Sequence, residues 1–302
     1  MTEQTAPISP ESDALLLRRL AAAGLDGVRT LRPVRSGTMA VACLAELADG
    51  TRAFVKTLAE PPGDDLFEAE AEGLAALRDL GGVATPEVLL ATSDLLVLRA
   101  LHPRPDTPGF WERLGHAVAA LHTATVHDRF GWHRDNWLGR KRQYNPWHTD
   151  GHEFYARYRI LRWLDEPLVA DALDREDRRA VERLCARLPE VVPAAPACLT
   201  HGDLWTANVV SGSGGEPVLV DPAVSYNWPE TDLSMLWNTH RPPESDRFFD
   251  AYTEAARPEP GWQERLPVLH LRQLLCLIAH GYPDRTLVEQ VRRVVAPFRR
   301  RG

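Results

Sequence analysis

The 302-residue sequence lacks any run of about 18 consecutive apolar residues, the length that a membrane-spanning helix needs. No segment near its N-terminus combines basic residues with an apolar stretch, so no targeting peptide is indicated. We therefore expect a cytoplasmic protein without a membrane partner. Basic residues are not in excess either, because the formal net charge is −7. Nucleic-acid binding, which favours a basic face, is not expected as the main activity.

Cysteine is also scarce. The four cysteines show none of the close paired spacings of a zinc site, and a chain of this length does not need disulfides. All four are expected to be reduced. Tight basic clusters are limited to Arg140, Lys141 and Arg142 and to residues 299–301, which we interpret as a solvated loop and a charged tail.

The most informative feature that is present is a polar segment, residues 200–208, followed by a short apolar strand that ends at Asp221. Asp203 and Asn208 lie five residues apart within the first segment. Residues 207–211 and 217–221 are strand candidates, and the glycine-rich residues 212–215 join them. The pattern predicts a hairpin that brings Asn208 and Asp221 within reach of one ion.

These residue types suit phosphoryl transfer from Mg-ATP. The amide oxygen of Asn208 and the carboxylate of Asp221 are hard oxygen ligands of the kind that Mg²⁺ prefers. Asp203 would remain free to take the proton of an acceptor hydroxyl as a general base. The arrangement therefore predicts the reaction centre of a kinase.

A second pair of charged residues lies upstream. Lys56 leaves a predicted strand, at the place where kinases hold the α- and β-phosphates. In the following helix Glu70 shares one face with Leu66 and Leu74, so its carboxylate faces the core. A carboxylate in that position needs a cationic partner, and we expect this partner to be Lys56.

The N-terminal part, residues 1–100, is predicted to be a nucleotide-binding lobe. Residues 1–8 are expected to be a frayed tail, and Pro10 begins a helix that runs to Gly24. Five strands are predicted over residues 31–34, 40–47, 51–58, 87–90 and 95–98. The turn with Ser36 and Gly37 is placed where a loop covers the phosphates, although a plain hairpin turn is equally compatible.

Residues 101–302 are predicted to form a mainly helical catalytic and substrate-binding lobe. Helices are expected from residue 109 to about residue 122 and over residues 150–164, 175–188 and 262–298. Residues 131–148 are interpreted as an irregular insert that lines a substrate site. Near the connection between the lobes, the backbone around Leu98 and Ala100 is expected to bind adenine. The fold class is thus α+β with two lobes.

Residues 201–205 (His-Gly-Asp-Leu-Trp), with Asn208 and residues 221–223 (Asp-Pro-Ala), resemble the fructosamine kinase (ketosamine 3-kinase) branch of the aminoglycoside phosphotransferase-like kinases. The resemblance extends from about residue 31 to about residue 298. Its further matching residues are Phe67 to Glu70, Leu74, Phe130, Gly131, Asp135 to Gly139, Gln143, Asn145, Trp147, Phe154 to Arg157, Arg159, Tyr226, Glu230, Asp232 and Leu233.

The resemblance implies a protein-kinase-like fold and an enzyme that transfers the γ-phosphate of Mg-ATP to a sugar hydroxyl. In that family the acceptor is typically the 3-hydroxyl of a ketosamine, a small glycated amine. Carried over residue by residue, Asp203 is the base, Asn208 and Asp221 are the magnesium ligands, and Lys56 and Glu70 hold the phosphates. A monomer is favoured.

Other residues near the centre receive structural or substrate roles. His201 is expected to brace the backbone rather than to act chemically, and Asp232 to accept bonds from catalytic-loop amides at a helix start. Trp205, Tyr226 and Trp228 have two possible roles, as core aromatics or as a stacking wall for a sugar.

Two departures from the family pattern lie near the acceptor side. The family usually has Gly and a His-like polar residue where Asn227 and Trp228 stand, and a Phe-Gly-Gly segment near residues 237–240. These departures leave the kinase assignment intact and the acceptor open. The alternatives are an aminoglycoside or choline-like phosphotransferase and an inactive nucleotide-binding protein with a kinase fold. A metallohydrolase using His201 is disfavoured, because no second histidine cluster accompanies it.

Overall fold

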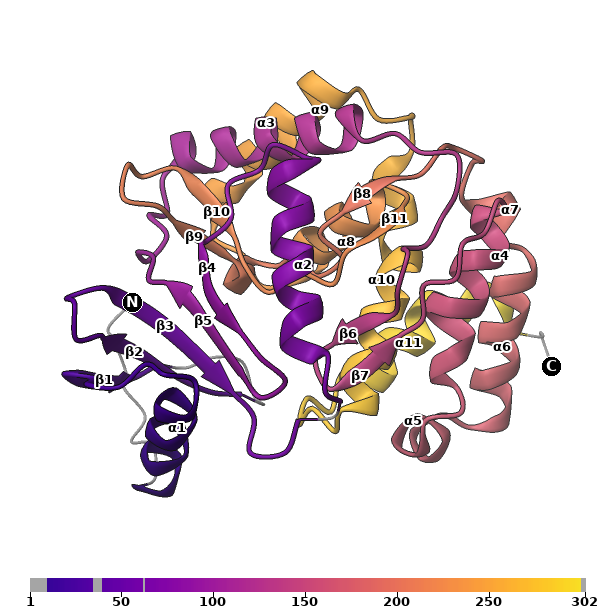
Figure 1. The fold of residues 1–302 in the computed structure, drawn as a ribbon. Coiled ribbons are helices and arrows are strands. Elements are labelled where there is room, and N and C mark those ends of the chain that lie inside the picture. Colours follow the sequence, from indigo (N-terminus) through magenta and orange to yellow (C-terminus); the bar gives the residue numbers. More distant parts are fainter. Residues whose placement is uncertain (1–9, 35–39, 62, 300–302) are drawn as a thin grey trace.

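The computed structural model describes residues 10–34, 40–61 and 63–299, and these form two lobes (Figure 1). The N-terminal lobe contains an antiparallel five-stranded sheet with the order β1-β2-β3-β5-β4. Its elements are α1 (Pro10–Ala22), β1 (Thr30–Pro33), β2 (Val41–Glu46), β3 (Arg52–Thr57), α2 (Leu66–Asp79), β4 (Val88–Ala91) and β5 (Leu95–Arg99). The five predicted strands and the helix between them are all present, with ends that differ by one or two residues.

The two faces of this sheet carry different apolar sets because side chains alternate along each strand. On one face Val55 and Val97 pack with Leu16 and Leu20 of α1. On the other face Leu96 and Leu98 pack with α2. Lys56 lies between Val55 and Thr57 near the end of β3, the central strand of the sheet, opposite Ala42 and Leu96. Its side chain therefore shares the face that is covered by α2.

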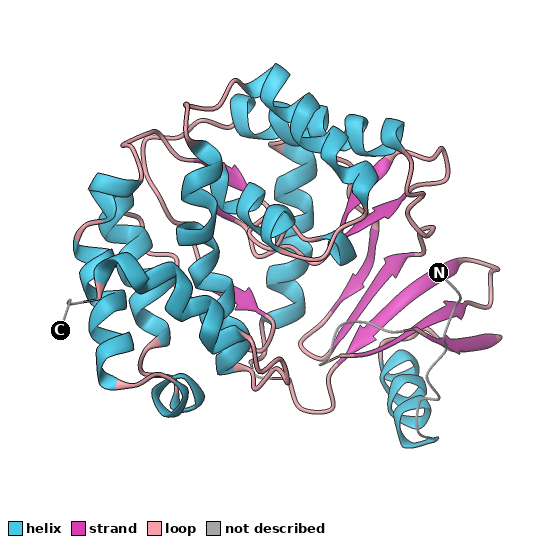
Figure 2. Ribbon diagram, turned by 180° about the vertical axis from the view of Figure 1, so that it is seen from behind, coloured by secondary structure: helices cyan, strands magenta, loops and turns pink. Residues whose placement is uncertain are grey.

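The C-terminal lobe is mainly helical and carries three small antiparallel sheets (Figure 2). Its helices are α3 (Pro108–Ala124), α4 (Gly151–Tyr155), α5 (Pro167–Ala172), α6 (Arg175–Ala186), α7 (Leu188–Val191), α8 (Glu230–Asn238), α9 (Asp246–Ala256), α10 (Trp262–Ala279) and α11 (Leu287–Val295). Its strands are β6 (Asn136–Leu138), β7 (Lys141–Gln143), β8 (Cys198–Thr200), β9 (Val209–Ser211), β10 (Pro217–Leu219) and β11 (Ser225–Asn227). The three sheets are the pairs β6–β7, β9–β10 and β8–β11.

Three expectations for this lobe need correction. The insert is not irregular throughout, because its residues 136–143 form the hairpin β6–β7 with Gly139 at a φ of +60° in the turn. The helix expected over residues 150–164 changes after α4 into a single π-helical stretch and a short 3-10 turn. The C-terminal helical region is divided into α10 and α11, and Gly281, at a φ of +69°, lies between them.

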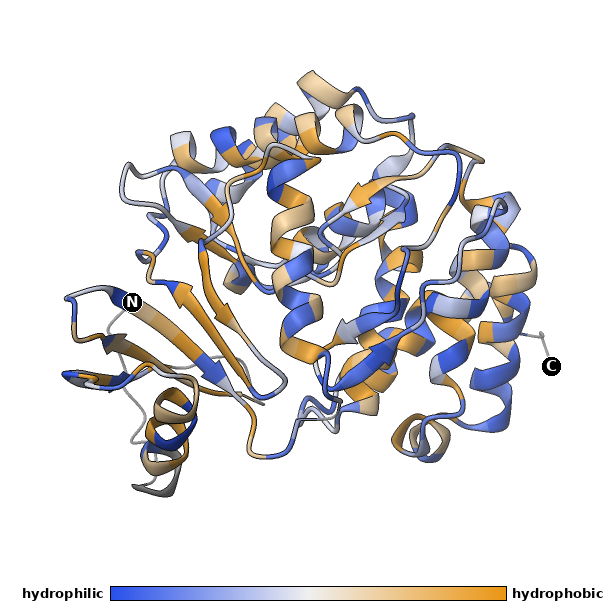
Figure 3. Cartoon of the chain, viewed as in Figure 1, coloured by the Kyte–Doolittle hydropathy of each residue, from blue (hydrophilic) through white to orange (hydrophobic). Residues whose placement is uncertain are grey.

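Apolar side chains fill two connected regions of the C-terminal lobe. One lies between α3 and α9, with Trp111 and Phe248 in its centre, and the other surrounds α10. Figure 3 shows the contrast between the apolar strands β4 and β5 and the hydrophilic hairpin strand β7. Among the helices that the structure describes, none is long and apolar enough to cross a membrane.

Candidate active site

The hairpin β9–β10 brings Asn208 and Asp221 together as the sequence predicts. Val209 pairs with Leu219 and Val210 with Val218, and the glycine-rich turn closes the hairpin. At its open end the amide of Val220 donates to the carbonyl of Asn208 at 3.1 Å. The Nδ2 atom of Asn208 also approaches the carbonyl oxygen of Asp221 at 3.5 Å.

Asp203 joins these two residues, and its two carboxylate oxygens differ. Oδ2 accepts a hydrogen bond from Nδ2 of Asn208 at 3.1 Å. Oδ1 is buried and has no hydrogen-bond partner among the described residues. Burial and then the charge of Asp221 raise the pKa of Asp203 to about 7, against a partial lowering by Arg272 and Asn208. The carboxylate thus has one oxygen available to a bound molecule.

Lys56 forms ion pairs with both Glu70 and Asp221. Its Nζ lies 2.9 Å from Oε2 of Glu70 and 2.7 Å from Oδ1 of Asp221. The expected Lys56–Glu70 pair is therefore present, and Glu70 is only 8% exposed. Burial alone would lower the pKa of Lys56, but Asp221 and Glu70 together raise it above its ordinary value, so the ammonium stays charged. Burial raises the pKa of Glu70, and Lys56 opposes that shift.

The backbone of Asp221 has a conformation that few residue types other than glycine adopt. Its φ is +57°, in the left-handed region that Asp tolerates better than most residues with a side chain. Neighbouring atoms that exclude water favour its neutral form, but the charge and hydrogen bond of Lys56 outweigh this and lower the pKa of Asp221. The side chain remains 52% exposed, so the carboxylate is accessible.

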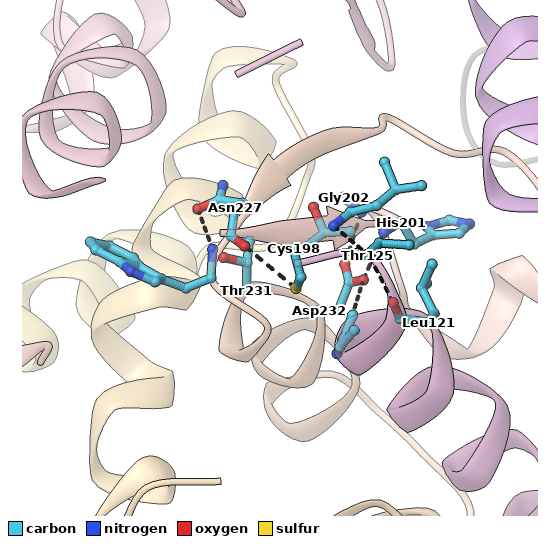
Figure 4. A network of polar contacts seen from close by, with 12 residues as sticks. Leu121, Thr125, Cys198, His201, Gly202, Asn227, Thr231 and Asp232 are labelled. Carbon is cyan, nitrogen blue, oxygen red and sulfur yellow. Dashed lines mark hydrogen bonds and ion pairs between the residues drawn. The ribbon is translucent and has the colours of Figure 1, made fainter. Parts of the chain in front are cut away.

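Asp232 at the start of α8 fixes the catalytic loop, as the sequence indicates. Its carboxylate accepts the backbone N–H groups of His201 at 2.7 Å and Gly202 at 2.8 Å (Figure 4). His122 of α3 lies 3.3 Å from the same carboxylate. Burial opposes ionisation of Asp232, but the bond from His122 and these other contacts lower its pKa overall. Gly202 has a φ of +80°, and a Cβ there would lie 2.1 Å from the carbonyl oxygen of Ala223.

His201 has the bracing role that we expected. Its Nε2 lies 3.0 Å from the carbonyl oxygen of Val220, which can only accept, so Nε2 carries the proton. Its Nδ1 then accepts the N–H of Asp203 at 3.2 Å. Both ring nitrogens are thereby engaged in the neutral form, and burial lowers the pKa of His201 in agreement. The ring joins the catalytic loop to the end of β10.

Arg272 of α10 was not identified from the sequence. It is 2% exposed, and its guanidinium donates to the carbonyl of Gly202 at 2.7 Å and to Oε1 of Gln143 at 2.9 Å. Within the described residues it has no carboxylate partner at ion-pair distance. The backbone of Gly202 is thus held at its N–H group by Asp232 and at its carbonyl by Arg272. The one signal in the sequence was an arginine in the apolar stripe between Leu269 and Cys276.

The predicted adenine-binding residues lie at the end of β5. Leu98 is buried on the same sheet face as Lys56. The amide of Ala100 donates to the carbonyl of Arg52 at 2.9 Å, so this N–H is not available to a base. The amide of Leu101 has no partner among the described residues. Ser36 and Gly37 lie outside the described residues.

The three aromatic candidates for the substrate wall are placed differently. Trp205 lies in the catalytic loop and is partly exposed, and its amide donates to the carbonyl of Asp203 at 3.0 Å. Tyr226 stacks on His127, with ring centroids 4.3 Å apart, in an aromatic group around Trp147. Trp228 is only 1% exposed and packs among core aromatics. These contacts suit the role of a core aromatic, while the substrate contact of Trp228 stays a prediction, because its ring also lines a pocket with residues 149–152.

The oxygen donors around Asp221 fit a magnesium ion. In the described residues Oδ1 of Asn208 accepts no hydrogen bond, and Oδ2 of Asp221 has no ion-pair partner. No group of three or more His, Cys, Asp or Glu side chains suited to a metal occurs in the described chain. Mg²⁺ does not require such a cage, because it is commonly bound through one or two protein oxygens together with water and substrate phosphates.

Comparisons with known proteins show the family of the chain. The family model for fructosamine kinase matches residues 20–288. A protein-ribulosamine 3-kinase of Oryza sativa subsp. japonica is 30% identical over 225 residues, which are 72% of this chain and 64% of that protein. The chain therefore spans less than two thirds of the length of this relative.

Solved structures support the same assignment. One from Thermobifida fusca, with a proposed fructosamine-3-kinase function, is 34% identical with a TM-score of 0.81, over 93% of this chain and 98% of that one. An aminoglycoside phosphotransferase mutant in complex with ADP and hygromycin B has a TM-score of 0.61 at 16% identity, over 92% of this chain and 97% of that one, and shows similarity of fold alone. The two-lobed α+β fold is that of the protein-kinase-like phosphotransferases, and the chain belongs to the fructosamine kinase family.

Proposed function

We propose that the protein is a kinase that transfers the γ-phosphate of Mg-ATP to a sugar hydroxyl, most specifically the 3-hydroxyl of a fructosamine or related ketosamine. The observation that carries this proposal is Oδ1 of Asp203, a buried acceptor without a partner in the described residues. A buried polar atom without a partner is costly unless a ligand completes it. The neighbouring Asn208 and Asp221, which suit a metal-bound phosphate, support the proposal that this ligand is an acceptor hydroxyl.

In this mechanism Asp203 orients the acceptor hydroxyl and takes its proton through Oδ1 as the oxygen attacks the γ-phosphorus. Oδ2 stays on Asn208, so the carboxylate cannot rotate freely. A pKa of about 7 lets Asp203 accept a proton and release it near neutral pH. His201, Asp232 and Arg272 hold the loop that positions it.

The nucleotide side is formed by Lys56, Glu70, Asn208 and Asp221. Mg²⁺, held by Asn208 and Asp221, would neutralise charge on the phosphates during transfer. Lys56 would exchange its contact with Asp221 for the α- and β-phosphates while Glu70 keeps the ammonium in place. Leu98 would line the adenine pocket, and the backbone near Ala100, where the amide of Leu101 has no partner among the described residues, would bind the base edge. Ser36 and Gly37 are proposed to cover the phosphates.

The acceptor side is proposed to include Trp205, which is partly exposed next to Asp203. Tyr226 is proposed to contact the acceptor from the aromatic group that it forms with His127 and Trp147. We place the activity in the cytoplasm on small glycated amines, with the protein acting as a monomer.

The test is a coupled assay of ADP release with Mg-ATP and a panel of fructosamines and ribulosamines. The wild-type protein should release ADP with at least one panel member, and the Asp203→Asn variant should not. The site of phosphorylation on the product, read by NMR, checks the 3-hydroxyl. No acceptor-dependent ADP release above the Asp203→Asn control would reject ketosamines as the substrate class.

A further inference from the structure

Two carboxylates on the side of α2 away from the reaction centre have no role in the proposed chemistry. Asp65 directly precedes α2, and Glu72 lies two positions after Glu70. Two positions along a helix correspond to a rotation of about 200°, so Glu72 faces away from Lys56. Both carboxylates are bound by side chains of the insert in the other lobe.

Asp65 stands at the N-cap position of α2, yet its side chain does not cap the helix. Instead its Oδ2 accepts from Arg134 at 2.7 Å, and its Oδ1 accepts from Arg142 at 2.7 Å and from Nε1 of Trp137 at 3.0 Å. The side chain of Asp65 thus forms three contacts with residues distant in the sequence instead of capping the helix.

Glu72 is bound in the same way about two helical turns further along. Its Oε1 accepts from Nε1 of Trp132 at 2.9 Å and lies 2.9 Å from Nε2 of His133. Its Oε2 accepts from Arg134 at 3.3 Å. Arg134 therefore joins both carboxylates. We call Asp65 and Glu72, with Trp132, His133, Arg134, Trp137 and Arg142, the α2 clamp.

The insert that supplies these donors is itself attached beside the reaction centre. Asn136 donates to the carbonyl of Val224 at 2.8 Å, and Gln143 donates to the carbonyl of Ala223 at 3.0 Å. Gln143 also accepts from Arg272, which holds Gly202. The hairpin β6–β7 lies next to the N-terminal end of α2 (Figure 1). One continuous polar path therefore leads from the residues after Asp221 to α2.

Close packing strengthens this contact. The guanidinium of Arg142 lies over the ring of Trp137, 4.9 Å from its centroid. The same ring packs on the apolar residues between α2 and the sheet. At Gly63, in the loop before α2, a Cβ atom would lie 2.5 Å from Trp137, so a larger residue there would displace the ring. The basic residues of the insert are thus engaged within the protein rather than presented to a substrate.

We infer that the α2 clamp is a positioning device that holds α2 so that Glu70 stays on Lys56, and that it thereby sets the affinity for the nucleotide. This inference rests on the proposed function for its effect on ATP, but not for its effect on α2 itself. Because α2 is a rigid helix, displacement of its N-terminal turns moves Glu70 as well. The members of the clamp are positioning residues and do not touch the reacting atoms.

The test compares two variants of the same hairpin. Arg134→Gln with Arg142→Gln removes the cationic half of the clamp, and Lys141→Gln is the matched control. Lys141 lies between Arg134 and Arg142 in the sequence, but it pairs with Glu166 of its own lobe at 2.6 Å. Hydrogen–deuterium exchange of residues 66–79 reports on α2, and steady-state kinetics separate the KM for Mg-ATP from the KM for the acceptor and from kcat.

In the double variant we expect exchange in α2 and the KM for Mg-ATP each to rise about five- to tenfold, a size typical of coupling through packed networks. The acceptor KM should change little. The Lys141→Gln control should leave exchange in α2 and both KM values unchanged. The variant Arg134→Lys with Arg142→Lys keeps the positive charges, so its exchange in α2 and its KM for Mg-ATP should lie between those of the double glutamine variant and those of the wild type. Equal exchange of α2 in the double variant and the control would overturn the inference.

A milder variant guards against misfolding. Trp137→Phe keeps an aromatic ring and both arginines but loses the donor to Asp65 and part of the ring volume, so exchange in α2 should rise less than in the double variant. Unchanged exchange in Trp137→Phe, where the double variant does not fold, would also overturn the inference. If no acceptor is phosphorylated, the proposed function fails, while the exchange measurement still decides whether the clamp holds α2.

Discussion

The two sides of α2 are both rich in charge, but they differ in how completely their polar atoms are paired. On the outer side all four carboxylate oxygens of Asp65 and Glu72 have donors. At the reaction centre Oδ1 of Asp203 has none among the described residues. Burial favours the neutral form of Asp65, but Arg142 and Arg134 lower its pKa, whereas burial and Asp221 raise the pKa of Asp203.

This difference distinguishes polar groups that hold the structure from polar groups that are available to a ligand. A fully paired cluster contributes position and some stability, and it offers nothing to a ligand. An incompletely paired, buried carboxylate is retained at a cost in stability because a substrate completes it.

The strongest way to break the comparison is to remove the unpaired carboxylate. Asp203→Asn should lower kcat by about a thousandfold or more, because positioned bases contribute about 10²–10⁴ in rate. The affinity for Mg-AMP-PNP, measured by calorimetry, should stay within about threefold, since one oxygen of this residue faces the acceptor. The variant should also unfold at the same or a higher temperature, because a buried charge beside Asp221 is removed. A fully active variant would disprove the assignment of the base.

The second largest effect is expected for Asp232, which holds the loop that carries Asp203. Asp232→Ala leaves the amides of His201 and Gly202 without an acceptor, and each unpaired buried donor costs about 1–3 kcal/mol. We expect the free energy of unfolding to fall by about 2–5 kcal/mol in a urea titration. Asp232→Asn, which keeps one acceptor oxygen, should lose less. Equal stability of the alanine variant and the wild type would contradict the bracing role.

Arg272 tests whether a buried cation without a carboxylate partner supports the same loop. Arg272→Met leaves the carbonyl of Gly202 and the side chain of Gln143 without this donor, so the free energy of unfolding should fall by about 1–3 kcal/mol. The value of kcat should fall while the affinity for Mg-AMP-PNP is kept. A variant with unchanged kcat would show that Asp232 alone fixes the loop.

On the paired side, Asp65→Asn should cost about 1 kcal/mol of unfolding free energy, the usual size for a partly exposed ion pair. The sign with pH follows from the lowered pKa of Asp65. The difference from the wild type should be complete above the unfolded-state pKa of about 4 and should disappear as the pH falls through the lower folded-state pKa. Urea titrations at pH 7 and at pH 3 provide the measurement. A difference that grows in acid would contradict the pairing.

The smallest effect is expected for Lys141→Gln, which removes the ion pair with Glu166. A single, partly exposed pair at the surface contributes about 0–1 kcal/mol, so the free energy of unfolding should fall by less than in Asp65→Asn, where several contacts are lost. The kinetic constants should equal those of the wild type. A large kinetic change here would show that the hairpin acts on the centre through more than the α2 clamp.

Much of the reaction centre could be predicted from the sequence because its geometry is local. The hairpin that joins Asn208 to Asp221 follows from two short apolar segments around a glycine-rich turn. Glu70 was expected to pair with Lys56 because helical spacing placed a carboxylate in an apolar stripe. Such contacts depend on strand alternation and helix period, which the order of residues alone specifies.

Other features were decided by tertiary structure, because their partners are distant in the chain. Arg272 lies about 70 residues from the glycine that it holds, and Arg142 lies 77 residues from Asp65. No local pattern distinguishes a buried arginine from a solvated one, so residues 140–142 were first expected to form a solvated loop. For the same reason the sequence left both roles of Trp228 open, because the space that surrounds an aromatic ring is made by side chains from other elements. The sequence by itself thus determined which residues could form the centre, whereas only packing between elements distant in the chain decided what holds them in place.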